Sequence, residues 1–132
     1  TMQIHQSAED YLETILMLNQ RMGRVRSIDV VNELGYTKAS VSIAMKKLRE
    51  NGYIAVDGEG NLTLLEPGRE IAERIYSRHR LLTHFFVQLG VEEDIAAEDA
   101  CKAEHILSEQ TLEKIREYAL LHDAESTLKK ED

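Results

Sequence analysis

The sequence predicts a mostly α-helical protein with one short β-hairpin near its middle, and three patterns lead to this expectation. Apolar residues recur at helical spacing over most of the 132 residues. Residues 53–65 instead contain two short apolar runs that flank a turn-rich segment, Asp57-Gly58-Glu59-Gly60-Asn61. Several of the helical stretches are followed by glycine, which favours the end of a helix.

Three helices are expected before the hairpin, and they run from Ser7 to about Met22, from Ser27 to Leu34 and from Lys38 to about Asn51. Ser7 and Thr37 are good N-caps, and Gly35 is a stop signal between the second and third helices. A short helix, a glycine-containing turn and a longer helix form a helix-turn-helix. Because the hairpin of residues 53–65 follows at once, the expected fold is an N-terminal winged helix-turn-helix.

Three more helices are expected after the hairpin, from Glu66 to about Leu89, from about Asp94 to Leu107, and from Ser108 to about Leu121. Pro67 suits the first turn of a helix, and Gly90 breaks the pattern. The end of the chain, residues 124–132, is polar and is expected to fray. We therefore predict two domains, a winged helix-turn-helix over residues 1–66 and a helical domain over residues 67–132.

The distribution of charge points to nucleic acid more clearly than the net charge does. The net charge of −8 argues against simple nucleic-acid binding, but residues 37–49 hold four Lys or Arg and no acid. From residue 67 onward there are 9 Lys or Arg against 15 Asp or Glu. A basic element on an acidic body is expected when one face meets phosphate, although a solvated helix face would look the same by charge alone.

The third expected helix would enter the major groove of DNA with its first turns. Hydroxyl groups can bond phosphates or base edges, an isoleucine can contact a thymine methyl, and lysines suit phosphates. Each side chain by itself is almost as well explained as an exposed residue without a role in DNA binding. The predicted DNA-binding residues are Arg26, Thr37, Lys38, Ser40, Ser42, Ile43, Lys46 and Lys47.

The cellular setting expected from the sequence is the cytoplasm. No stretch approaches the ~20 apolar residues of a membrane span, and the first residues lack a secretory signal pattern. The single cysteine, Cys101, has no partner for an internal disulfide. It is a buried small hydrophobe, a reactive thiol or a metal ligand, and the first reading is favoured when it is taken alone.

A candidate metal site begins with Cys101, Glu104 and His105, which are spaced i, i+3 and i+4. On a helix these positions share one face, and thiolate, carboxylate and imidazole are all ligands of first-row divalent metals. The first helix adds Asp10 and Glu13, again spaced i, i+3. Each set alone is better explained as exposed polar side chains or as acidic side chains that stabilise the start of a helix.

The fourth helix carries His79 between two arginines. Taken alone, this histidine is explained equally well as a side chain that packs against its neighbours without binding metal. His84 lies five residues further on, roughly 140° around the helix from His79, and is assigned no role.

Taken together, these segments resemble the diphtheria-toxin-repressor family of metal-dependent regulators, and especially its short manganese-sensing branch. The resemblance runs from Ser7 to about Leu121, and the segments that carry it are Ala8-Glu9-Asp10-Tyr11-Leu12-Glu13, Thr37-Lys38-Ala39-Ser40-Val41-Ser42, Arg78-His79-Arg80-Leu81-Leu82 and Cys101 through Ser108.

The resemblance implies a homodimeric repressor that binds a palindromic operator in double-stranded DNA when a divalent metal is bound. It implies that residues 67–132 carry dimerisation and metal binding, with the first helix also supplying ligands. The ligands that it implies are Asp10, Glu13, His79, Cys101, Glu104 and His105. Metal binding would then favour the arrangement of the dimer that matches two half-sites in DNA.

Two departures bear on the identity of the metal. Cys101 stands where the manganese-sensing branch has a carboxylate and iron sensors have cysteine, but iron sensors lack the pair Asp10 and Glu13 and add a glutamate near position 83, where this chain has Thr83. From the length of the chain we expect no additional C-terminal domain like that of the larger iron sensors. We expect Mn²⁺ first and Fe²⁺ next, with Co²⁺ or Zn²⁺ able to bind in vitro.

Two other functions fit parts of the sequence. A winged-helix regulator that senses a small organic ligand would show the same helices and hairpin. A metalloenzyme is disfavoured because no nucleophile elbow, phosphate-binding glycine loop or histidine-rich zinc motif accompanies the cluster. We therefore expect no enzymatic activity.

Overall fold

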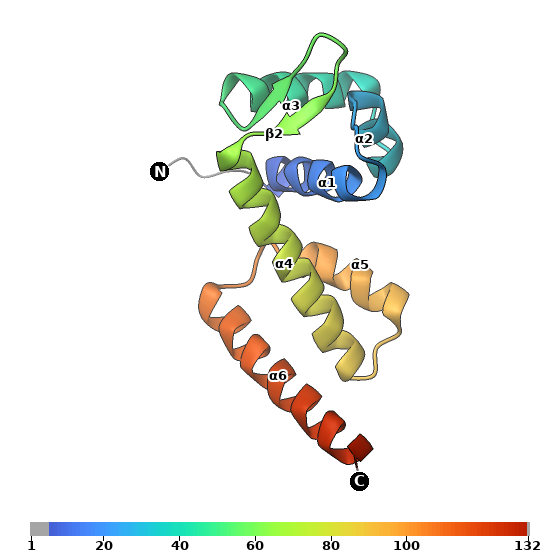
Figure 1. The fold of residues 1–132 in the computed structure, drawn as a ribbon, viewed down its shortest axis with the longest axis vertical. Helices are drawn as coiled ribbons and strands as arrows, with labels where there is room; N and C mark the ends of the chain where they lie inside the picture. The colour runs from blue at the N-terminus through green and yellow to red at the C-terminus, as the bar shows by residue number, and fades with distance from the viewer. Residues whose placement is uncertain (1–5, 132) are drawn as a thin grey trace. The chain divides into compact units, whose positions relative to one another are not determined.

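The computed structural model of the chain describes residues 6–131, with side chains described as far as residue 125 (Figure 1). It divides into two compact units at Arg74 and Ile75. Helices form most of both units, and the strands pair as one two-stranded sheet, which confirms the predicted fold class. Within the described residues, no helix is long and apolar enough to cross a membrane.

The first unit contains α1 (Gln6–Met22), α2 (Ser27–Leu34), α3 (Lys38–Glu50), β1 (Ile54–Val56), β2 (Leu62–Leu64) and the first turns of α4 (Glu66–Gln88). The two strands are antiparallel, with Ile54 opposite Leu64 and Val56 opposite Leu62. In Figure 1 this hairpin follows α3 directly. A hairpin behind the second helix of a helix-turn-helix is a wing, so the winged architecture is present.

The core of the first unit is apolar and comes from each of its elements. The periodic positions of α1 are fully buried, and single residues of the other elements complete the core: Leu12, Ile15, Leu18, Val25, Val30, Val41 and Ile54. The helical period places the α1 residues on one face, whereas the alternation of the strands turns Leu62 and Leu64 inward and leaves Thr63 exposed. This core fixes α2 and α3 against α1.

The turn between α2 and α3 is set by two local signals. Gly35 has a φ of 72° and its N–H donates to Val31 O at 2.8 Å, which ends α2 in a left-handed cap. Thr37 then accepts a hydrogen bond from the Ser40 N–H at 3.1 Å and so begins α3. The exposed face of α3 is therefore positioned by Gly35 and Thr37, the two residues that the sequence predicted to end α2 and begin α3.

Gly68 allows α4 to begin close to the wing. A Cβ at this position would lie 2.2 Å from the carbonyl oxygen of Tyr53, which is backbone and cannot move aside. The first turn of α4 thus passes the start of β1 at a distance that only glycine permits.

The second unit contains the rest of α4, then α5 (Glu93–Ala103) and α6 (Glu109–Glu131). Its small core is formed by Leu82, Ala100 and Leu112, one residue from each helix. Phe86, Leu107 and Ile115 pack against this cluster. The helices of this unit are therefore joined by a few central contacts.

Three expected boundaries are wrong. Helix α1 begins at Gln6, so Ser7 lies inside the helix and is not its cap. Helix α5 ends at Ala103 rather than at Leu107, since the chain turns after Ala103 and α6 then packs against Leu82 through Leu112. Helix α6 continues to Glu131, where a frayed end was expected.

Candidate metal centre and nucleic-acid interface

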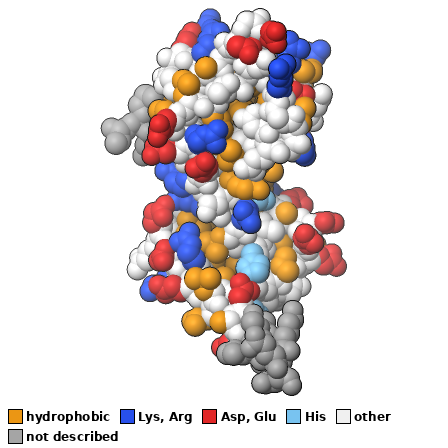
Figure 2. All heavy atoms as spheres, in the orientation of Figure 1, with side chains coloured by type: hydrophobic (Ala, Val, Ile, Leu, Met, Phe, Trp, Pro, Cys, Tyr) orange, Lys and Arg blue, Asp and Glu red, His pale blue; other side chains and the backbone are white. Residues whose placement is uncertain are grey.

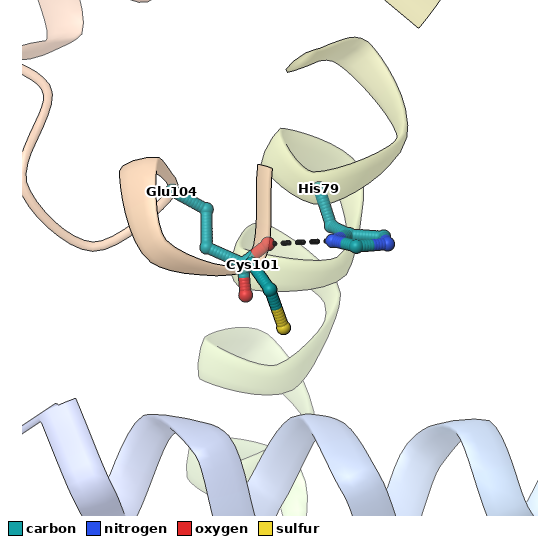
Figure 3. A group of neighbouring side chains, drawn as sticks. All are labelled: His79, Cys101 and Glu104. Atoms are coloured by element: carbon teal, nitrogen blue, oxygen red, sulfur yellow. Dashed lines mark hydrogen bonds and ion pairs between the residues drawn. The ribbon is translucent and has the colours of Figure 1, made fainter. Parts of the chain in front are cut away.

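Three of the predicted metal ligands lie together in the second unit. His79 comes from α4, Cys101 from the last turns of α5, and Glu104 from the residue that follows α5 (Figure 3). Their ligand atoms all lie within 4.8 Å of one another. Nδ1 of His79 is 2.9 Å from Oε2 of Glu104, and the dashed line in Figure 3 marks this contact.

Glu104 is the central group of this cluster, and its side chain is 0% exposed. Its second oxygen, Oε1, lies 3.4 Å from Nε2 of His105 and has no hydrogen-bond partner among the described residues. Burying a carboxylate is costly unless cations or donors compensate its charge. A divalent cation would supply that compensation, so the side chains present fit a metal ion of this kind.

The local backbone explains why residues 101 and 104 still share a face although α5 ends between them. Glu104 has helical φ and ψ of −59° and −23°, and its N–H donates to Ala100 O at 3.0 Å. The i, i+3 relation to Cys101 is therefore kept through the C-cap.

Cys101 is exposed, so its interpretation as a buried small hydrophobe is wrong. The imidazole of His105 is 1% exposed beside the Glu104 carboxylate. His84 stands apart from the cluster: its Nε2 lies 3.0 Å from both carboxylate oxygens of Asp123 on α6, and this hydrogen bond holds the pKa of Asp123 below its usual range.

The other two predicted ligands, Asp10 and Glu13, lie on α1 in the first unit. Asp10 is half-buried and Glu13 is 5% exposed, which is unusual for carboxylates. Their role as ligands stays a prediction.

In the first unit, α3 presents the predicted DNA-contacting side chains to solvent. All of those on or next to α3 are exposed: Thr37, Lys38, Ser40, Ser42, Ile43, Lys46 and Lys47. Ile43 is 58% exposed, so its apolar side chain is available to contact a thymine methyl as predicted. A groove of about 430 Å³ lies between α2 and α3 and is lined by Ser27, Ile28, Val31, Lys38 and Ser42.

The face drawn in Figure 2 shows how the charges are distributed. Lys and Arg side chains occur over the wing and its neighbouring helices, where Asp and Glu side chains also occur, and Asp and Glu side chains gather over α5. The first turn of α5 is acidic in sequence, with Glu93 and Asp94. This face therefore shows the acidic α5, whereas both signs of charge are mixed over the first unit.

Arg26 is exposed, but its guanidinium contacts the wing. Nε donates to the carbonyl oxygen of Glu59 at 3.0 Å, and Nη2 donates to the same oxygen. The backbone of Arg26 also forms an antiparallel bridge with Asn61. Within this structure Arg26 holds the wing, whereas DNA contact was predicted from the sequence.

The tip of the wing is closed by Asp57. Its carboxylate accepts from the N–H groups of Glu59 and Asn61 and from the Asn61 side chain, each at 2.9 Å. The bond from the Asn61 side chain is the main reason why the pKa of Asp57 lies below its ordinary value. The wing turn is thus ordered by its own polar side chains.

Two family profiles match the chain in succession. Residues 3–62 match the N-terminal DNA-binding domain of the iron dependent repressors, and residues 65–121 match their metal-binding and dimerisation domain. A transcriptional regulator MntR from Escherichia coli is 32% identical over 116 residues, which cover 88% of this chain and 75% of that protein. The chain belongs to the iron-dependent repressor family, the family of the diphtheria-toxin repressor and MntR.

Two further relatives support this membership. An uncharacterized HTH-type transcriptional regulator from Methanocaldococcus jannaschii is 35% identical over 113 residues, which cover 84% of this chain and 90% of that protein. A solved structure described as a manganese-dependent transcriptional repressor in complex with manganese is 29% identical and has a TM-score of 0.78. The match covers 85% of this chain but 52% of that one, so this chain spans about half its length.

The predicted function class is therefore confirmed. This iron-dependent-repressor homologue is a metal-dependent DNA-binding repressor with a DNA-binding domain and a divalent-metal-binding, dimerising domain. The family is not enzymatic, which sets aside the metalloenzyme, and its metal dependence sets aside the organic-ligand sensor.

Sequence reasoning overlooked one side chain beside the cluster of candidate metal ligands. Nη1 of Arg78 donates to the carbonyl oxygen of Glu104 at 3.2 Å. The spacing of polar residues does not reveal this contact, because it depends on where the end of α5 meets α4. The adjacency of Arg78 to His79 is the one signal that the sequence offers.

Proposed function

We propose that this protein represses genes of metal homeostasis in the cytoplasm and is activated by Mn²⁺, with Fe²⁺ as the next candidate. The printed names of two relatives, an MntR regulator and a manganese-dependent repressor, support the choice of manganese. The operator is double-stranded and palindromic, because a symmetric dimer presents two equivalent recognition helices.

The observation that carries the proposal is the buried Glu104 carboxylate, whose Oε1 has no hydrogen-bond partner among the described residues. The adjacent imidazole and thiol, from His79 and Cys101, complete a set of three different ligand types. When bound, a divalent cation compensates the negative charge of this carboxylate. The proposed ligands are Asp10, Glu13, His79, Cys101, Glu104 and His105.

The chemistry of the ligands bears on the choice of metal. Carboxylate oxygens are hard ligands that suit Mn²⁺, whereas a thiolate favours Fe²⁺, Co²⁺ or Zn²⁺. Because three of the six proposed ligands are carboxylates and one is a thiol, manganese is placed first. Co²⁺ and Zn²⁺ are expected to bind in vitro.

We propose that residues 1–66 contact DNA and residues 67–132 carry dimerisation and most of the metal ligands. Lys46 and Lys47 would meet phosphates, and Ser42 and Ile43 would face base edges. The remaining proposed contacts are Arg26, Thr37, Lys38 and Ser40.

The experiment is a calorimetric titration of metal-stripped protein with Mn²⁺, anaerobic Fe²⁺, Co²⁺ and Zn²⁺, followed by DNA binding under each metal. Tight binding of Mn²⁺ that switches on DNA affinity supports the proposal, and activation by Fe²⁺ alone would replace manganese with iron.

Glu104→Ala tests the site itself, and it should abolish metal-dependent DNA binding without unfolding the chain. The matched control is Glu98→Ala on α5, whose carboxylate is 71% exposed and pairs with Lys102. This control should keep the metal response. Metal-stimulated DNA binding that survives Glu104→Ala would refute the proposed site.

A further inference from the structure

Arg78 precedes His79 on α4, and its side chain is 14% exposed. Nη1 donates to the backbone carbonyl of Glu104 at 3.2 Å, and Nη2 pairs with the carboxylate of Glu109. One side chain of α4 thus contacts the residue that caps α5 and the first residue of α6.

These two contacts bracket residues 104–108, which join α5 to α6. The last carbonyl groups of a helix have no hydrogen-bond partner inside the helix. At the end of α5, Glu104 O accepts a hydrogen bond from the Arg78 guanidinium. At the other end of the segment, the Ser108 hydroxyl accepts the Thr111 N–H at 3.2 Å. The backbone of the segment is therefore held at both ends.

The position of the Glu104 backbone determines where its carboxylate lies. Its carbonyl is bonded to Arg78, and its Oε2 is 2.9 Å from Nδ1 of the next residue on α4, His79. Backbone and side chain of Glu104 are therefore anchored to two consecutive residues of one rigid helix. Losing the backbone anchor would let the carboxylate move away from His79 and Cys101.

The charge of the guanidinium does not by itself favour a nearby metal cation. Glu109, whose side chain is 79% exposed, offsets that charge through its ion pair with Arg78. The benefit to a metal site is therefore geometric, since a fixed ligand loses less conformational entropy when the metal binds.

We propose that Arg78 is a positioning residue for the metal site, holding the backbone of Glu104 so that its carboxylate is preorganised beside His79 and Cys101. This inference rests on the proposed function, because it takes these side chains as metal ligands. Groups that orient ligands through hydrogen bonds typically change metal affinity by about 10- to 100-fold when they are removed.

The test is a calorimetric titration of the full-length, metal-stripped chain with Mn²⁺ and with Co²⁺. Arg78→Gln should weaken binding about 10- to 100-fold. Arg78→Lys should recover part of the loss, since an ammonium lacks the planar fork that reaches two acceptors at once. The matched control is Arg116→Gln on α6, which removes a guanidinium that is 44% exposed and pairs with Glu113 within the same helix. It should bind metal like the unchanged protein.

Thermal unfolding of the metal-free variants separates positioning from a general structural role. Positioning predicts that metal affinity falls at 25 °C, where each variant is fully folded by circular dichroism, and that Arg78→Lys shows the intermediate affinity. The inference would be overturned if Arg78→Gln bound metal as tightly as the unchanged protein. If Arg78→Gln does not fold, the same result for Arg78→Lys would overturn it. Failure of the unchanged protein to bind either metal would instead overturn the proposed function, and with it this inference.

Discussion

In the first unit, the lysines of α3 lie at the surface above a core of apolar side chains, whereas in the second unit the carboxylate of Glu104 lies inside. The exposed lysines of α3 are hydrated, so the first unit is expected to fold with or without a ligand. The second leaves Glu104 Oε1 without a hydrogen-bond partner among the described residues, so the proposed metal ion is expected to stabilise it.

The contrast has one exception, because Glu13 of the first unit is also buried at 5% exposure. Among the described residues, the buried charged side chains are thus two of the proposed metal ligands, Glu13 and Glu104. Elsewhere, the charges of both units are exposed or half-buried. Under the proposed function, the buried charges belong to the metal site and the exposed charges of α3 would meet phosphate.

The largest effect is expected from the core of the second unit. Leu82→Ala removes the central side chain of the cluster with Ala100 and Leu112 and should cost about 3 kcal/mol. Hydrogen exchange should show faster opening in α5 and α6. Leu121→Ala is the control, because Leu121 is 66% exposed and should change stability by less than about 0.5 kcal/mol. Equal effects of the two changes would mean that this small core does not hold the unit together.

An intermediate effect is expected at the start of α3. Thr37→Ala removes the oxygen that accepts the Ser40 N–H and should destabilise the first unit by about 1 kcal/mol. Thr37→Ser keeps that oxygen and serves as the control. Denaturant unfolding measures both, and a Thr37→Ala protein as stable as Thr37→Ser would show that α3 is held by packing alone.

The smallest effect is expected at the wing. The pKa of Asp57 in the folded protein is lowered from its ordinary value of 3.8, chiefly by the hydrogen bond from the Asn61 side chain. Its stabilising contribution is therefore present above that ordinary value and is lost as the pH falls through the lowered pKa. Asp57→Asn should be slightly less stable than the unchanged protein at pH 7, and the difference should vanish in acid. NMR titration of the wing amides follows this directly, and a midpoint above 3.8 would contradict the assignment.

The order and type of the elements were predictable because their signals are local. Apolar periodicity, Gly35 and Thr37 specify α2 and α3, and the turn of residues 57–61 specifies the wing. The end of α5 was predicted four residues too late, because the sequence after Ala103 keeps a helical pattern while the chain must turn to let α6 pack on Leu82.

The grouping of His79, Cys101 and Glu104 was predicted in part by spacing and in part by resemblance. The spacing of Cys101 and Glu104 was sufficient to place them on one face, since it needs only the helical period. Their meeting with His79 could not be deduced from spacing, because it depends on how α5 packs against α4.

The sequence by itself determined the helices, the wing and the residue types that we propose bind metal and DNA, because caps, glycines and periodicity act over a few residues. Tertiary structure alone decided that Glu104 is buried, that Arg26 holds the wing through Glu59, and that Arg78 anchors the end of α5. Each of these depends on contacts between residues 25 or more positions apart in the chain, and long-range packing sets such contacts.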